Sequence, residues 1–282
     1  MLRGKLNNTK WYSRVALWIG VMAVCMLLTL FIWVIVGNPQ ETSSLKWFQF
    51  WQTLTVFILP ALLAVYLWSE KPIEWLHLNK GMSWKTALTA VGLMILAVPA
   101  INLLSHLNQQ LALPEFLRPL EIWMQEREQD AHVLTERFLD VDGYGGLMTV
   151  VGLMALLPAI GEELTFRGML QGLFSPKYKT AAIWIAAAIF SFIHFQFYGF
   201  VPRMLMGALF GYMLVWTGSL WVPILMHFTN NAMAVIGYYV THHYTMDSEW
   251  MDEFGSGSTW YVGVMSLALV TTICYFFARE RS

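Results

Sequence analysis

The sequence predicts an all-α, polytopic membrane protein: one integral membrane domain over residues 1–282, built from about eight transmembrane helices. Of its 282 residues, 57% are hydrophobic and only 12% are charged, which is about half the charged fraction of an ordinary soluble domain. The apolar residues gather in stretches of roughly 20, the length that crosses a bilayer. Lipid offers the backbone no hydrogen-bond partners, and the short alternating segments of a membrane barrel do not occur, so the spans should be helices.

Two segments between the expected spans are long enough to matter: residues 106–145, between the third and the fourth, and residues 242–258, which we expect to be a mobile outer loop. The first span follows a basic segment and is too long for the apolar part of a signal peptide, so we expect a retained anchor. The polar, acidic segment 106–145 carries Leu120, Trp123, Met124, Leu134 and Phe138 at loosely helical spacing. This pattern predicts an amphipathic helix on the outer surface, with a solvated linker as the alternative. The spans are residues 15–36, 50–69, 84–105, 146–170, 180–199, 201–218, 219–241 and 259–278.

Charge orients the predicted bundle. The chain has 17 basic and 18 acidic residues, a net charge of −1, so no basic field attracts nucleic acid. With the N-terminus inside and alternating spans, the cytoplasmic segments hold 11 of the 17 basic residues and the outer loops hold five. The positive-inside rule then predicts a multi-pass protein of the plasma or inner membrane with both termini in the cytoplasm. Cys25 and Cys274 lie far apart, which excludes a disulfide framework or a thiolate zinc site.

Polar side chains inside the spans are the candidate functional residues, because an ionisable group at mid-bilayer costs roughly 2.5–3.5 kcal/mol. Glu163 and Arg167 are four residues apart on one helical face and should form an ion pair. Glu162 is rotated by about 100° and is left free to act as a general base. The three patterns are Glu162-Glu163-x-x-x-Arg167 in the fourth span, Phe190-x-x-x-His194 in the fifth and His227-x-x-x-Asn231 in the seventh.

The depth of these groups along their helices predicts that they lie close together. Glu162 and His194 each lie 14 residues from the expected cytoplasmic end of their span, roughly 21 Å at 1.5 Å per residue. His227 and Asn231 lie about 12 and 18 Å above the start of the seventh span. A carboxylate, two imidazoles and an amide can therefore meet at one level, and together they are the groups that a hydrolase uses.

In this order, on three apolar helices, the patterns resemble the motifs of the CPBP (Abi) family, which includes the type II CAAX prenyl endopeptidases. The resemblance covers a core of roughly residues 146–240. It implies an intramembrane protease whose polar cavity opens towards the cytoplasm. It also implies that Glu162 is the general base, that His194 positions the attacking water, and that His227 and Asn231 donate to the oxyanion. Glu163 and Arg167 would be a supporting pair.

Members of this family are described both as metalloproteases and as metal-independent glutamic endopeptidases. Glu162, His194 and His227 would be the ligands if zinc were bound. However, the sequence has no HExxH motif, and Asn231 suits an oxyanion donor better than a ligand. We therefore favour a mechanism without a cofactor, and zinc is the alternative.

Two other functions fit buried ionisable groups: a proton- or cation-coupled transporter, and a silent scaffold of the same fold. No internal repeat and no matching pair of interrupted helices is evident, which favours the enzyme over the transporter. The expected partners are membrane lipid and a peptide or protein substrate that enters from the cytoplasm or the inner leaflet. Gly207 and Gly211 form a GxxxG pattern that predicts close helix packing, and we expect Asn230 to be a helix-facing polar residue.

Overall fold

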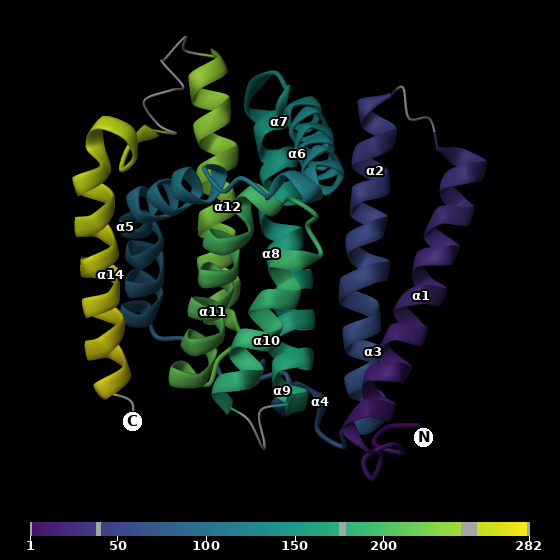
Figure 1. The fold of residues 1–282 in the computed structure, drawn as a ribbon. Helices are drawn as coiled ribbons and strands as arrows, with labels where there is room; N and C mark the ends of the chain where they lie inside the picture. The colour runs from purple at the N-terminus through teal and green to yellow at the C-terminus, as the bar shows by residue number, and fades with distance from the viewer. Residues whose placement is uncertain (1, 38–40, 175–178, 244–252, 281–282) are drawn as a thin grey trace.

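The computed structural model describes residues 2–37, 41–174, 179–243 and 253–280. Within these ranges the chain forms helices and connecting turns and contains no strand, as the sequence predicts. The long helices run side by side, and the N- and C-termini lie at the same end of the bundle, which we call the terminal end (Figure 1). Helices α6 and α7 lie at the opposite end.

Each expected span coincides with a helix or a run of helices. Six runs are long and apolar enough to cross a membrane, whereas Thr180–Phe192 is apolar but shorter, and α12 is not among the six. Two runs contain π-helical segments, Thr53–Ile58 between α2 and α3, and Val151–Leu156 and Leu164–Gln171 on either side of α8. The helices are α1 (Trp11–Val36), α2 (Thr42–Gln52), α3 (Leu59–Trp68), α4 (Pro72–Trp75), α5 (Trp84–Gln109), α6 (Arg118–Leu139), α7 (Gly143–Val150), α8 (Leu157–Glu163), α9 (Gly172–Phe174), α10 (Lys179–Phe192), α11 (Phe200–Thr217), α12 (Trp221–His243) and α14 (Trp260–Arg279).

The helix α10 ends earlier than the expected span 180–199. Its last residue is Phe192, and Phe195 adopts the left-handed conformation, with φ of 53°, which stops the helix. A 14-residue helix is about 21 Å long, short of the ~30 Å hydrocarbon core. The connection from α10 to α11 therefore turns back before it reaches the α6 end of the bundle.

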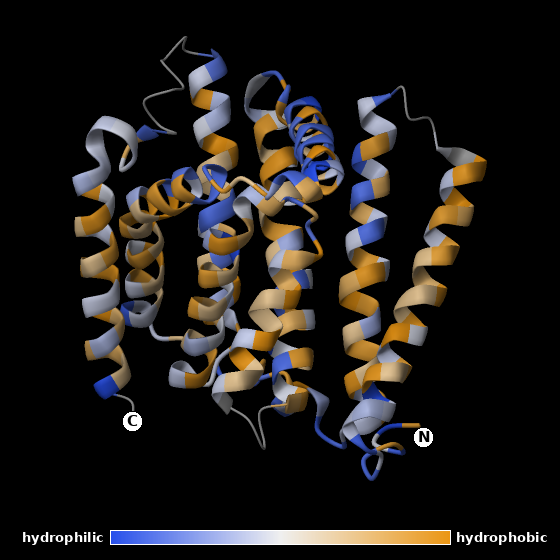
Figure 2. Ribbon diagram, in the orientation of Figure 1, coloured by the Kyte–Doolittle hydropathy of each residue, from blue (hydrophilic) through white to orange (hydrophobic). Residues whose placement is uncertain are grey.

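The segment 106–145 does form an amphipathic helix, α6, which is the most hydrophilic helix of the bundle (Figure 2). Leu120, Trp123 and Leu134 remain more than a third exposed, and part of the apolar face contacts protein. The Trp123 ring lies 6.3 Å from the ring of Phe195 and 5.7 Å from that of Phe197, and Phe138 is only 4% exposed. Thus α6 covers the tip of the α10–α11 hairpin.

The N-terminal helices pack against the region that carries the motifs. One buried cluster joins Trp18 of α1 and Trp68 of α3 to Phe166, Phe190 and Ile224. Apolar side chains from five separate helical segments thus share one core, and this core fixes the helices that position the candidate site.

Candidate active site

The candidate site begins with a buried ion pair. The Arg167 guanidinium donates from Nη1 to Oε1 of Glu163 over 2.7 Å, and neither side chain is exposed. The spacing of four residues predicted this pair. A second donor, Nη2, reaches the backbone carbonyl of Gly207 at 3.1 Å. The guanidinium also lies over the rings of Phe190 and Phe210, at 4.5 and 5.4 Å, so aromatic faces replace part of its lost hydration.

Gly207 and Gly211 allow α11 to approach this pair. Gln171 donates from Nε2 to the Gly211 carbonyl at 3.1 Å, one turn along from the contact of Arg167 with Gly207. A Cβ atom at position 207 would lie 2.9 Å from Nη2 of Arg167, and one at position 211 would lie 2.6 Å from Oε1 of Gln171. The GxxxG pattern therefore serves close packing, as expected, and it admits two polar side chains.

His227 lies between the two adjacent carboxylates. Its Nδ1 is 2.8 Å from Oε1 of Glu163, and its Nε2 is 3.7 Å from Oε2 of Glu162. Because an ionised carboxylate only accepts, the first contact puts a proton on Nδ1 and directs Nε2 towards Glu162. The sequence pairs Glu163 with Arg167 alone. Glu163 and His227 are 64 residues apart in the sequence, so no spacing rule within one helix predicts their contact.

His194 lies in the turn that follows α10. Its Nδ1 is 2.7 Å from the carbonyl oxygen of Phe190. A carbonyl only accepts, so Nδ1 carries the proton and Nε2 presents a lone pair. The Phe190 ring separates the two imidazoles, with its centroid 5.0 Å from that of His194 and 5.8 Å from that of His227. Phe190 thereby fixes the orientation of both histidines.

One cavity of about 380 Å³ collects the reactive groups. Four of the six sequence-predicted site residues line it: Glu162, His194, His227 and Asn231. The other two, Glu163 and Arg167, lie beneath its wall and contact His227 and the α11 backbone. The cavity is also lined by Gln49, Ala131, Leu134, Thr135, Phe138, Met154, Pro158, Phe190, Gln196, Arg203, Met206, Phe210 and Asn230.

Outside the predicted set, five polar residues line this cavity: Gln49, Thr135, Gln196, Arg203 and Asn230. Arg203, one of the five basic residues expected in outer loops, lies in α11 and donates to the backbone and side-chain oxygens of Gln196 at 3.1 and 3.0 Å. Asn230, expected to face a helix, lines the cavity and donates to Oδ1 of Asn231 at 3.2 Å. The sequence does hold one signal for Arg203, because this charged residue lies near the start of an apolar stretch.

The proposed zinc ligands do not form a ready cluster. Among the residues that the structure describes, no group of three or more His, Cys, Asp or Glu side chains is placed to hold a metal ion. Glu162, His194 and His227 share the cavity wall, and each histidine makes its protein contact through Nδ1, which leaves Nε2 as the nitrogen that would bind a metal. Zinc therefore stays the alternative to a mechanism without a cofactor.

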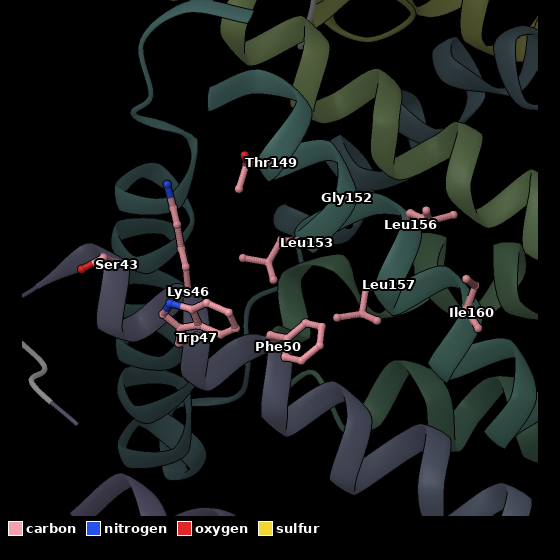
Figure 3. Close-up of a pocket in the computed structure, with 10 residues that line it drawn as sticks. All are labelled: Ser43, Lys46, Trp47, Phe50, Thr149, Gly152, Leu153, Leu156, Leu157 and Ile160. Atoms are coloured by element: carbon pink, nitrogen blue, oxygen red, sulfur yellow. The ribbon is translucent and has the colours of Figure 1, made fainter. Parts of the chain in front are cut away.

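A second cavity lies on another face of the helical run 143–174. It measures about 580 Å³ and is lined by side chains of α2 and of the segment 149–160, almost all of them apolar (Figure 3). Lys46 is its one charged lining residue. None of the six predicted site residues reaches it. Its lining suits lipid chains better than the chemistry of hydrolysis.

The resemblance implies a cavity that opens on the side of the termini, and the structure places part of the cavity wall at the other end. The cavity wall includes Ala131, Leu134 and Thr135 of α6, which lies away from the terminal end (Figure 1). Phe166 and Arg167, which lie in the 164–171 segment, are buried at 2% and 1% exposure. The span count does not describe this packing of α6 at the cavity wall.

Comparisons with known proteins point to one family. Residues 145–233 match the family model described as "Type II CAAX prenyl endopeptidase Rce1-like". All six predicted site residues lie inside this segment. An 84-residue stretch is 34% identical to the "Uncharacterized protein YpbD" of Bacillus subtilis (strain 168), covering 28% of this chain and 41% of that relative. The match thus spans less than half of the relative's length. No solved structure matches the chain.

Proposed function

Residues 145–233 belong to the Rce1-like family of type II CAAX prenyl endopeptidases, and from this premise we propose that the protein is an intramembrane endopeptidase. One observation carries the proposal: a free carboxylate, two imidazoles and an amide from three helical runs line a single cavity inside an apolar bundle. Each of these groups is costly in a membrane, so their convergence needs a purpose.

In the proposed mechanism, a water molecule lies between Glu162 and His194. Nε2 of His194 accepts a hydrogen bond from the water and orients it, while the Glu162 carboxylate takes its proton. The water oxygen attacks the carbonyl carbon of the peptide bond and forms a tetrahedral oxyanion. When the C–N bond breaks, the leaving amine receives the proton that Glu162 took. The products, a carboxylic acid and an amine, together hold the same atoms as the starting peptide and water.

His227 and Asn231 are the proposed oxyanion donors. With both ring nitrogens protonated, His227 keeps its Nδ1–H on Glu163 and offers its Nε2–H to the cavity. Asn231 has a long contact of 3.5 Å from Nδ2 to the Met154 carbonyl, which leaves amide donor capacity for a substrate. Glu163 and Arg167 position His227 and do not touch the substrate.

The shape of the cavity favours a protease over a transporter. The Glu163–Arg167 layer closes the cavity towards the terminal end, whereas a transporter moves its cargo past a central site. A silent scaffold of the same fold would keep this shape without the chemistry, so the activity of purified protein distinguishes the two.

The test is cleavage of a peptide library by the purified protein in detergent, with products identified by mass spectrometry. We expect Glu162→Gln to lower the cleavage rate by about two to four orders of magnitude, since it removes the base and keeps size and polarity. His194→Ala should have a similar effect. Glu74→Gln is the control, because Glu74 forms an exposed ion pair with Lys71 away from the cavity.

A folded Glu162→Gln variant that cleaves at the wild-type rate would refute the assignment of the base. The same assay with a chelator tests the zinc alternative. Loss of cleavage that added zinc restores would favour the metalloprotease mechanism.

A further inference from the structure

The two ends of the bundle differ in charge. Basic residues dominate the terminal end: they lie in the segment before α1 and in its first turn, directly before α4, in the connection from α4 to α5, at the start of α5 and at the end of α14. Contacts tie these segments together, since the Gly4 amide bonds the Tyr66 carbonyl at 3.0 Å and Ser219 bonds the backbone of Lys80. The basic residues are Arg3, Lys5, Lys10, Arg14, Lys71, Lys80, Lys85 and Arg279.

Acidic residues dominate the other end, in α6 and in the turns that flank it. They outnumber the basic residues of that segment, Arg118, Arg127 and Arg137. The acidic residues are Glu115, Glu121, Glu126, Glu128, Asp130, Glu136, Asp140 and Asp142. Since short cytoplasmic segments carry the excess of Lys and Arg, the terminal end should be cytoplasmic and the α6 end should lie outside.

The backbone of the α10–α11 connection favours the entry of water from the α6 end. The α10–α11 connection leaves the helical conformation at about 21 Å from the start of α10. Non-helical backbone at this depth is stable only where protein buries it or where it lines a hydrated cavity. His194 and Gln196 of this connection line the catalytic cavity and are partly exposed.

From these observations we propose that the catalytic cavity opens on the extracytoplasmic face, and that the substrate is a polypeptide segment exposed on that face. The substrate class is then an exported peptide, or the outer tail or loop of a membrane protein. The proposal rests on the proposed function for the existence of a substrate. The orientation of the cavity stands on geometry and charge alone.

The test is thiol labelling of intact bacterial cells that express single-cysteine variants, in a background with Cys25→Ser and Cys274→Ser. Gln129→Cys places a thiol on the exposed face of α6, and Thr135→Cys places one on the cavity wall. Gly81→Cys is the matched control at the terminal end, where an added Cβ meets no atom within 4 Å. The probe is a charged maleimide that does not cross membranes, applied before and after permeabilisation.

We expect the maleimide to label Gln129→Cys and Thr135→Cys in intact cells, and Gly81→Cys only after permeabilisation. The reverse pattern, with Gly81→Cys labelled in intact cells and both α6 variants protected, would overturn the proposal and place the cavity in the cytoplasm. Two separate α6 positions keep the test decisive if one variant fails to fold.

A second measurement separates this inference from the proposed function. Right-side-out and inside-out vesicles are given an impermeant charged peptide that the purified protein cleaves. Cleavage confined to right-side-out vesicles is the expected result. Cleavage confined to inside-out vesicles would refute the proposed orientation and leave the proposed protease function standing. Purified protein that cleaves no peptide would refute the protease function, and the labelling would still report the orientation of the cavity.

Discussion

At the residue scale, one atom holds the site together: Oε1 of Glu163 accepts hydrogen bonds from Arg167 at 2.7 Å and from His227 at 2.8 Å. Neutralising this carboxylate leaves a buried guanidinium without its counter-charge. We expect Glu163→Gln to lower the free energy of unfolding by about 3–5 kcal/mol. Glu162→Gln should leave it unchanged or raise it, because the carboxylate of Glu162 has only a long contact of 3.7 Å with Nε2 of His227 and the substitution removes its buried charge.

Denaturant unfolding of both variants in one detergent measures this difference, and the two positions form a matched pair of adjacent glutamates. Equal losses of stability for Glu163→Gln and Glu162→Gln would contradict the division of roles. Arg167→Ala should resemble Glu163→Gln, because it leaves the other half of the pair buried.

The contacts of the site differ in how far the sequence could predict them. Spacing of four residues along one helix predicted the pairs Glu163–Arg167 and Phe190–His194, because helix geometry alone puts such residues on one face. The contact between Glu163 and His227 joins two helices, and its existence depends on their rotation and depth. No pattern within one segment contains that information.

At the scale of elements, α11 is held against the 143–174 run by side chains that bond its glycine carbonyls. A methyl group at position 207 would lie 2.9 Å from Nη2 of Arg167 and 3.2 Å from Cβ of Ala187. We expect Gly207→Ala to lower the free energy of unfolding by about 1–3 kcal/mol, since the helices must move apart or Arg167 must leave its carbonyl.

Gly152→Ala is the control for this substitution. It lies in the same helical run as Arg167, and its added methyl group meets no atom within 4 Å. The greater helix propensity of alanine should make this variant neutral, or more stable by up to about 1 kcal/mol. Unfolding curves for the two variants measure the difference, and a Gly207→Ala variant as stable as Gly152→Ala would show that α11 does not need the glycine.

Hydropathy predicted the positions of the helices, because each apolar stretch must satisfy its own backbone as a helix. The expected span 84–105 became α5, Trp84–Gln109, and the span 259–278 became α14, Trp260–Arg279. The early end of α10 was not predicted, since Phe195 enters the left-handed region without a glycine or proline to signal it. The docking of α6 through Trp123 depends on that same turn.

At the scale of the whole molecule, the end at which the cavity opens follows from how segments far apart in sequence pack together. Counting residues along a span gives the depth of Glu162 and says nothing about which end is covered. The terminal end is filled by α3, the 164–171 segment and the start of α12, which share one buried cluster. The other end holds the short α10–α11 hairpin, and there side chains of α6 line the cavity.

The two large cavities offer two routes to the bundle interior, and filling each one tests which route the substrate uses. Ala131 lines the catalytic cavity, and Gly152 lines the apolar cavity between α2 and the 143–174 run (Figure 3). We expect Ala131→Trp to abolish peptide cleavage, because an indole from α6 would occupy space above Glu162. Gly152→Trp should leave the cleavage rate close to that of wild type, since none of the six predicted site residues lines the apolar cavity. Cleavage rates per folded protein, with melting temperatures as the control, measure both effects. If Gly152→Trp stops cleavage and Ala131→Trp does not, the substrate enters laterally from the lipid through the apolar cavity.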